Sequence, residues 1–99
     1  MAEKSSYRRI EAIKVTVAIL RMLADQRQPV SGREVARAVD APEGTVQCHL
    51  ATLEDEKLVR SIGGAWELDM GLALFWARRK AMLAGRIARD TDELNRLEE

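Results

Sequence analysis

The beginning of the chain carries apolar residues at three- and four-residue steps, which is the period of an amphipathic helix. One apolar series follows this spacing: Ile10, Ile13, Val17, Leu20 and Ala24. A second series lies off that face: Ala12, Val15, Ile19 and Met22. The pattern predicts a helix that ends near residue 26. Because it is too apolar to expose half of its surface to water, we expect the first face to meet the core and the second to contact a partner chain. Enclosure of both faces within the domain is the alternative.

Two shorter helices are predicted next. Ser31 and Glu34 have the spacing of a capping box, in which each side chain accepts a hydrogen bond from a free backbone N–H at the start of a helix. The helix that begins there stops before Pro42, because proline restricts the residue that precedes it. A third helix runs from about residue 42 to residue 56. Its inner line is Val46, Leu50 and Leu53, and its outward side chains are Thr45, Gln47, Cys48 and Thr52.

Residues 58–62 and 65–68 have the composition of short strands and flank Gly63-Gly64, a dipeptide suited to a tight hairpin turn. From about residue 70 the pattern is helical again, with an interruption expected at Gly85. A heptad seam runs along this last helix: Trp76, Leu83, Ile87, Leu94 and Leu97. Lys80 and Asp90 occupy two further seam positions. We expect this seam, together with Val15, Ile19 and Met22, to hold a homodimer.

Two short helices joined by a tight turn and followed by a two-stranded ribbon define a winged helix-turn-helix. The predicted fold class is therefore mainly α with a small β-hairpin wing: a three-helix core, a two-stranded wing and a long C-terminal helix. We assign residues 1–69 to the winged helix-turn-helix domain and residues 70–99 to the C-terminal helix that mediates dimerisation.

Residues 13–68 resemble the DNA-binding domain of the IclR family of bacterial transcription regulators. The matching stretches are residues 30–36 (VSGREVA), 41–46 (APEGTV), 50–54 (LATLE) and 58–60 (LVR). Family members usually carry a large effector-binding domain after the wing, whereas here we expect one helix in its place. Lys57 stands where the family usually has a glycine.

The resemblance implies a transcription regulator whose third helix lies in the major groove of duplex DNA. The residues that it implies as DNA contacts are Ser31, Arg33, Gly44, Thr45, Gln47, Cys48, Thr52 and Arg60, with Arg8, Arg9 and Lys57 extending the phosphate clamp. Gln47 has the donor and acceptor that pair with adenine, and Gly44 permits close approach. Two copies would then occupy half-sites about 34–36 Å apart, one turn of duplex.

The composition of the chain argues against several classes of function. The chain has 99 residues, enough for one small domain, and its 16 basic residues balance its 16 acidic ones. One cysteine and one histidine cannot supply a zinc tetrad, so no metal and no cofactor is expected. Cys48 and His49 are neighbours, which a helix turns about 100° apart, so they do not form a catalytic pair and no enzyme is expected. With no long apolar run or leader, we expect no membrane partner and a cytoplasmic protein.

The charge of the third helix supports a second hypothesis. Residues 41–56 include no Lys or Arg and have a formal charge of −4, which opposes an approach to phosphate. The alternative is a winged-helix protein–protein interaction or assembly module that does not bind DNA. His49 is interpreted as a hydrogen-bonded residue at the edge of the core.

Overall fold

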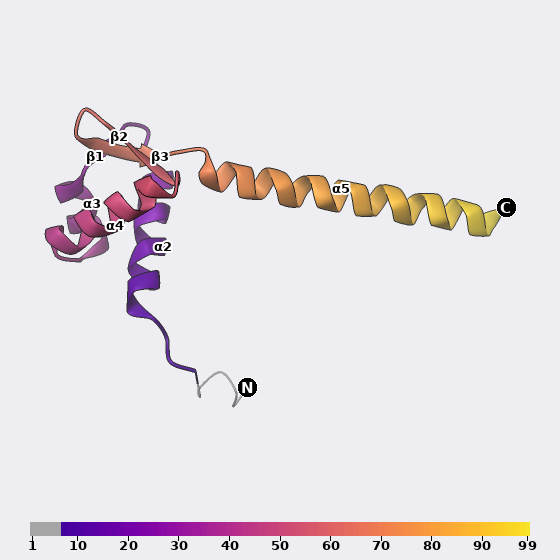
Figure 1. Cartoon of the computed structure of the whole chain (residues 1–99), viewed down its shortest axis with the longest axis horizontal. Helices are drawn as coiled ribbons and strands as arrows, with labels where there is room; N and C mark the ends of the chain where they lie inside the picture. Colours follow the sequence, from indigo (N-terminus) through magenta and orange to yellow (C-terminus); the bar gives the residue numbers. More distant parts are fainter. Residues whose placement is uncertain (1–6) are drawn as a thin grey trace.

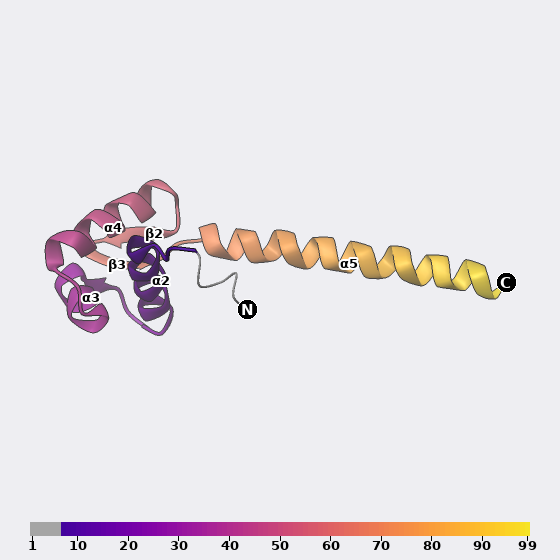
Figure 2. The ribbon, with the colours of Figure 1, turned by 90° about the horizontal axis from the view of Figure 1, so that it is seen from below.

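The computed structural model describes residues 7–99, which form four helices and three strands (Figure 1). In chain order they are α2 (Glu11–Ala24), β1 (Val30–Ser31), α3 (Gly32–Val39), α4 (Glu43–Asp55), β2 (Val59–Ile62), β3 (Ala65–Leu68) and α5 (Gly71–Glu98). The first three helices and the sheet pack together, and α5 projects away from them (Figures 1 and 2). The predicted winged helix-turn-helix with a long C-terminal helix is confirmed.

The core lies where α2, α3 and α4 meet the base of the hairpin. It is built from residues that the helical and strand patterns place on inner faces: Ile19, Leu23, Val30, Val35, Ala36, Val46, Leu50, Leu53 and Val59. Ile19, Val35, Val46, Leu50 and Val59 are completely removed from solvent. Burying a side chain of this size stabilises a fold by roughly 1.5–3 kcal/mol, so this small cluster carries the stability of the domain.

The predicted assignment of the two faces of the first helix is wrong except at Leu20, which packs against the core as expected. Ile19, expected at a dimer contact, is fully buried in the core of its own chain, and Val15 and Met22 pack against that core. Ile13 and Val17, expected to face the core, are exposed. Both series have helical spacing, so periodicity alone does not distinguish them. The core takes the face that also contains Leu23, which is buried in one cluster with residues of α3 and α4.

The helix-turn-helix is built as the sequence predicts. The Ser31 hydroxyl accepts a hydrogen bond from the Glu34 backbone N–H at 3.1 Å, and Glu34 Oε1 accepts one from the Ser31 backbone N–H at 3.5 Å, so the capping box is present. Asp40 ends α3 in the left-handed region, with φ 54°. Pro42 then precedes α4 in an extended conformation, φ −59° and ψ 141°, which sets the turn between the two helices.

The hairpin belongs to a three-stranded antiparallel sheet in the order β1-β3-β2. Gly63 and Gly64 have φ of 57° and 83°, the left-handed values that a tight two-residue turn requires. The third strand, β1, was not predicted. It spans two residues and pairs Val30 with Trp66 and Ser31 with Ala65, so the start of α3 is attached directly to the wing.

The C-terminal helix is continuous from Gly71 to Glu98, so the interruption predicted at Gly85 is wrong. A single glycine lowers helix stability by roughly 1 kcal/mol without ending the helix. Gly71 fixes where α5 starts: its backbone N–H donates to the Lys57 carbonyl at 3.0 Å, and an added Cβ would lie 2.5 Å from that oxygen. No residue of α5 is buried. Among residues 7–99, no helix is both long and apolar enough to cross a membrane.

Candidate nucleic-acid interface

One face of α4 packs in the core and the other is open to solvent. Val46, Leu50 and Leu53 are buried, and the predicted outward residues are all exposed: Gly44, Thr45, Gln47, Cys48 and Thr52. The sequence pattern therefore predicts correctly which face of α4 is presented. The centre of this face holds small side chains at helical spacing, Gly44, Cys48 and Ala51, and a Cβ at Gly44 would meet no heavy atom within 4 Å.

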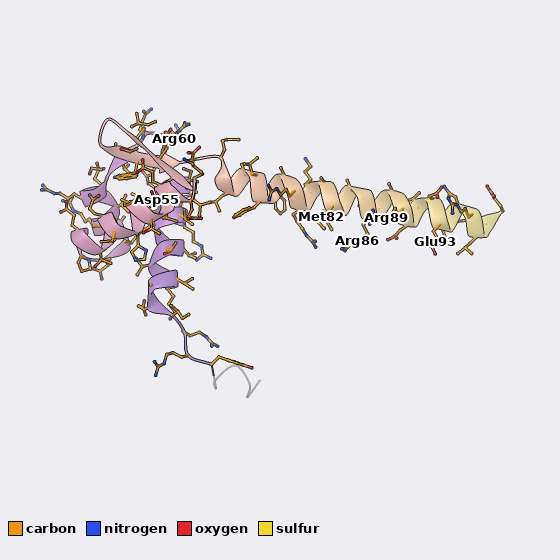
Figure 3. The ribbon with its side chains drawn as sticks, viewed as in Figure 1. Asp55, Arg60, Met82, Arg86, Arg89 and Glu93 are labelled. Carbon is orange, nitrogen blue, oxygen red and sulfur yellow. The ribbon has the colours of Figure 1, made fainter. Side chains whose placement is uncertain are left out.

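The carboxylates of α4 lie at its two ends. Glu43 is in the first turn, and Glu54 and Asp55 are in the last (Figure 3 labels Asp55). Residues 44–53 between them carry no acidic or basic side chain apart from His49. The exposed middle of α4 is thus narrow and uncharged, although the helix as a whole is anionic.

Gln47 has a structural contact that the sequence does not reveal. Its side-chain amide lies against Gly32 at the start of α3, so closely that a Cβ on Gly32 would overlap it. Gly32 is buried beneath this contact. Gln47 therefore covers the first turn of α3, where the resemblance implies a phosphate contact, and its amide is positioned by α3 as well as by α4.

Cys48 and Thr52 lie at the edge of the exposed face of α4 that is nearest to α2. Together with Thr16, His49 and Leu53 they line a shallow pocket between the two helices. The Thr52 hydroxyl donates to the Cys48 carbonyl at 2.8 Å, within its own helix. Cys48 is exposed as a free thiol.

His49 joins α4 to α2 as a partly buried residue. Its Nδ1 is 2.9 Å from the Thr16 hydroxyl, which also donates to the Ala12 carbonyl at 2.9 Å. Because a hydroxyl has one hydrogen to donate, a Thr16 that donates to Ala12 accepts from the Nδ1–H of His49. This confirms the interpretation of His49 as a hydrogen-bonded residue at the edge of the core.

Two arginines predicted to contact phosphate have carboxylates beside them. Arg60 Nη2 and Nε lie 2.6 and 2.7 Å from Glu67 Oε2, because the hairpin register places these residues opposite each other. Figure 3 shows Arg60 on the hairpin, above the end of α4. Arg33 Nε is 3.8 Å from Glu43 Oε2, a longer contact between two exposed side chains at the starts of α3 and α4. A two-residue turn at Gly63-Gly64 defines the register of this hairpin, so the sequence contained the signal for the Arg60–Glu67 pair.

Within residues 7–99, no three His, Cys, Asp or Glu side chains gather as metal ligands. The exposed face instead combines a helix with an uncharged outer surface, a second helix whose capped start lies next to it, and a β-hairpin attached to that start. These features define a winged helix-turn-helix domain of the DNA-binding type.

Comparison with known proteins identifies the family. The IclR helix-turn-helix domain matches residues 12–63, from α2 to the turn of the hairpin, and the chain belongs to this family. The matched domain is the helix-turn-helix domain by which IclR family transcription regulators bind DNA. No curated protein matches the chain.

A solved structure has the same fold. The chain is similar to the crystal structure of an IclR family transcriptional regulator from Brucella abortus, with a TM-score of 0.65 and 24% sequence identity. The match covers 76% of this chain and 30% of that regulator. The chain thus spans less than a third of the length of the protein that it resembles.

Proposed function

We propose that the protein is a sequence-specific transcription regulator that binds duplex DNA as a homodimer, with α4 in the major groove. The uncharged, small-residue surface of α4 carries this proposal. A major groove about 12 Å wide admits an α-helix, and small outer side chains leave room for its backbone to approach the bases closely. Gly44, Cys48 and Ala51 supply that room. In this assignment residues 1–69 bind DNA in the cytoplasm and residues 70–99 join two copies.

Thr45 and Gln47 flank the small residues and are the side chains proposed to contact base edges. Gln47 can pair its amide with adenine, a contact that discriminates against the wrong base by about 1–3 kcal/mol. The contact of Gln47 with Gly32 supports this role, because a side chain that is already positioned loses less conformational entropy when it binds.

Phosphate contacts are proposed for the start of α3 and for the wing. Ser31 and Arg33 lie at the end of α3 where backbone N–H groups favour anions, and Arg60 extends from the hairpin. Arg33 and Arg60 both lie near carboxylates, so we expect each half-site to bind weakly. A dimer on two half-sites raises the affinity, because the second contact becomes intramolecular.

Fluorescence anisotropy with a random duplex, at about 50 and about 200 mM salt, tests DNA binding. We expect binding at the lower concentration and a steep loss at the higher one, because counterions are released from contacted phosphates. Absence of binding at both concentrations would contradict the proposal. It would favour a protein-interaction module, the second candidate, which the carboxylates beside Arg33 and Arg60 support.

A selected duplex tests the base contacts. Replacing Thr45 and Gln47 by alanine should reduce the preference for the selected sequence over random DNA more than it reduces binding to random DNA. Thermal unfolding shows whether loss of the contact between Gln47 and Gly32 has destabilised the variant. An unchanged preference in a folded variant would remove these side chains from the proposed reading surface.

A further inference from the structure

The long C-terminal helix exposes an apolar stripe that nothing else in residues 7–99 covers. The helix leaves the domain at Gly71 and extends into solvent (Figures 1 and 2). Its seam is exposed at Trp76 by 67%, at Ile87 by 66%, at Leu94 by 55% and at Leu97 by 79%. An apolar stripe of this length on a helix surrounded by water indicates a partner helix.

The two charged residues of the seam identify the partner and its direction. Trp76, Leu83, Asp90 and Leu97 occupy one heptad position, and Ala73, Lys80, Ile87 and Leu94 occupy the other. In a parallel pair each residue faces its own copy, so Lys80 would face Lys80 and Asp90 would face Asp90. Like charges held at a helix interface oppose association. A parallel pair of α5 helices is therefore disfavoured by its own sequence.

We propose that α5 pairs with α5 of a second copy in the antiparallel direction, in the register that places Lys80 opposite the partner's Asp90. The same register aligns every other seam position with an apolar one. Leu83 faces the partner's Ile87, Trp76 faces the partner's Leu94, and Ala73 faces the partner's Leu97. The centre of the pair falls at the level of Gly85.

Shifting the helices by one heptad removes this match. In one direction Lys80 would face the partner's Leu97 and Asp90 the partner's Ile87. In the other direction Lys80 would face the partner's Leu83 and Asp90 the partner's Ala73. Each shift leaves both charges against apolar side chains, where desolvation is uncompensated. Among these antiparallel registers, the proposed one pairs both charged layers.

The charge difference between the two halves of α5 also favours an antiparallel arrangement. Residues 71–89 contain five basic side chains and no acidic one, whereas residues 90–99 contain five acidic side chains and one arginine. Figure 3 shows Arg86 and Arg89 in the basic part of α5 and Glu93 beyond them. Antiparallel pairing brings Arg79 beside the partner's Glu93 near each end of the pair, and the same flank brings Arg86 beside the partner's Arg86 at its centre. On the other flank Ala77 and Ala84 are small enough to let the two backbones approach.

The pairing has a consequence for DNA. It places the two domains at opposite ends of the helix pair, with residue 70 of one copy about 45 Å from residue 70 of the other at 1.5 Å per residue. The domain lies beyond the start of α5, on the side away from the helix (Figure 1). This separation exceeds one turn of duplex and fits half-sites two turns apart, roughly 68–72 Å.

Charge exchange across the seam tests the proposal in sedimentation equilibrium. Lys80→Asp places a new carboxylate opposite the partner's Asp90 in both symmetry-related layers, so the dissociation constant of the dimer should rise about tenfold or more. The double variant Lys80→Asp/Asp90→Lys restores opposite charges and should return to within about threefold of the original value. Arg78→Asp makes the same charge change on the opposite side of α5 and should leave the dissociation constant within that range. Circular dichroism confirms that each variant is helical.

A parallel pair predicts a different result, because the double exchange would still leave like charges facing each other. The proposed register is overturned if the double variant fails to recover, or if Lys80→Asp and Arg78→Asp weaken the dimer equally. A monomeric wild-type protein at about 100 µM would overturn the pairing itself, since useful helix pairs associate well below that concentration. The proposal specifies the dimer of the proposed function, but the experiment contains no DNA. A failed charge exchange therefore does not alter the result expected from the duplex titration. Absence of DNA binding does not alter the result expected from the charge exchange.

Discussion

The pair between Arg60 and Glu67 allows a direct test of the proposed contact between the wing and DNA. Two nitrogens of the Arg60 guanidinium lie 2.6 and 2.7 Å from the same carboxylate oxygen of Glu67. A phosphate that approaches this part of the wing therefore meets a neutral pair. Glu67→Gln keeps the size of the side chain and removes its charge, so that no carboxylate of Glu67 neutralises Arg60 when a phosphate approaches.

The expected gain follows from counterion release. One additional phosphate contact steepens the dependence of log K on log salt concentration by about 0.9. Over a fourfold change in salt, from about 200 to about 50 mM, this corresponds to about 3.5-fold in affinity per domain. The substitution should cost at most about 1 kcal/mol of stability, because the Arg60 side chain is 54% exposed and surface ion pairs contribute little.

Fluorescence anisotropy over a salt series measures this slope for each variant. Glu98→Gln is the matched control, because it removes the same charge from α5, outside the wing. The double variant Arg60→Ala/Glu67→Gln should lose the gain, since the freed cation is then absent. An unchanged slope in Glu67→Gln would refute the reasoning, and so would an equal change in Glu98→Gln, which would trace the effect to net charge instead of the wing.

Other variants test the fold and its junction with α5. Gly71→Ala should disturb the start of α5, since the new Cβ would meet the Lys57 carbonyl at 2.5 Å; we expect a lower melting temperature in thermal unfolding. In Gly85→Ala the new Cβ would contact only the end of the flexible Arg89 side chain, at 3.5 Å. We expect the change to stabilise α5 by about 1 kcal/mol, seen in circular dichroism as helix that persists to a higher temperature. Leu50→Ala should lower the free energy of unfolding in urea by about 2–5 kcal/mol, because Leu50 is fully buried. Selection from random DNA should yield half-sites about two turns apart rather than one.

The helix-turn-helix could be predicted in detail because its signals are local. The capping box at Ser31, the stop at Pro42 and the turn at Gly63-Gly64 each depend on a few adjacent residues. The end of α4 is also set by local backbone conformation, at a position where lysine is less favourable than glycine. Lys57 adopts φ 63° at the end of α4, where the family usually has glycine, and Leu58 closes the turn through a 2.9 Å hydrogen bond to the Leu53 carbonyl.

The faces of α2 and the contacts of the candidate site could not be predicted in the same way. Both apolar series on α2 have helical spacing. Which of them enters the core depends on how α2 packs against the rest of the domain. The two-residue strand β1 has no pattern of its own and exists because the hairpin lies beside it. The contact between Gln47 and Gly32 likewise joins two helices whose crossing sets the distance.

The charges of the helix-turn-helix domain explain why the proposed pairing of α5 matters for DNA binding. The proposed reading surface of α4 is uncharged, and Arg33 and Arg60 lie near carboxylates, so we expect one domain to gain little from counterion release. In the proposed dimer, affinity then depends on holding two domains on one duplex, because the effective concentration of the second site is set by their connection. A rigid helix pair supplies this better than a flexible linker, since its length fixes the distance between the domains. The ion pair at Lys80 and the partner's Asp90 would thereby control which spacing of half-sites the protein accepts, although neither residue contacts a base.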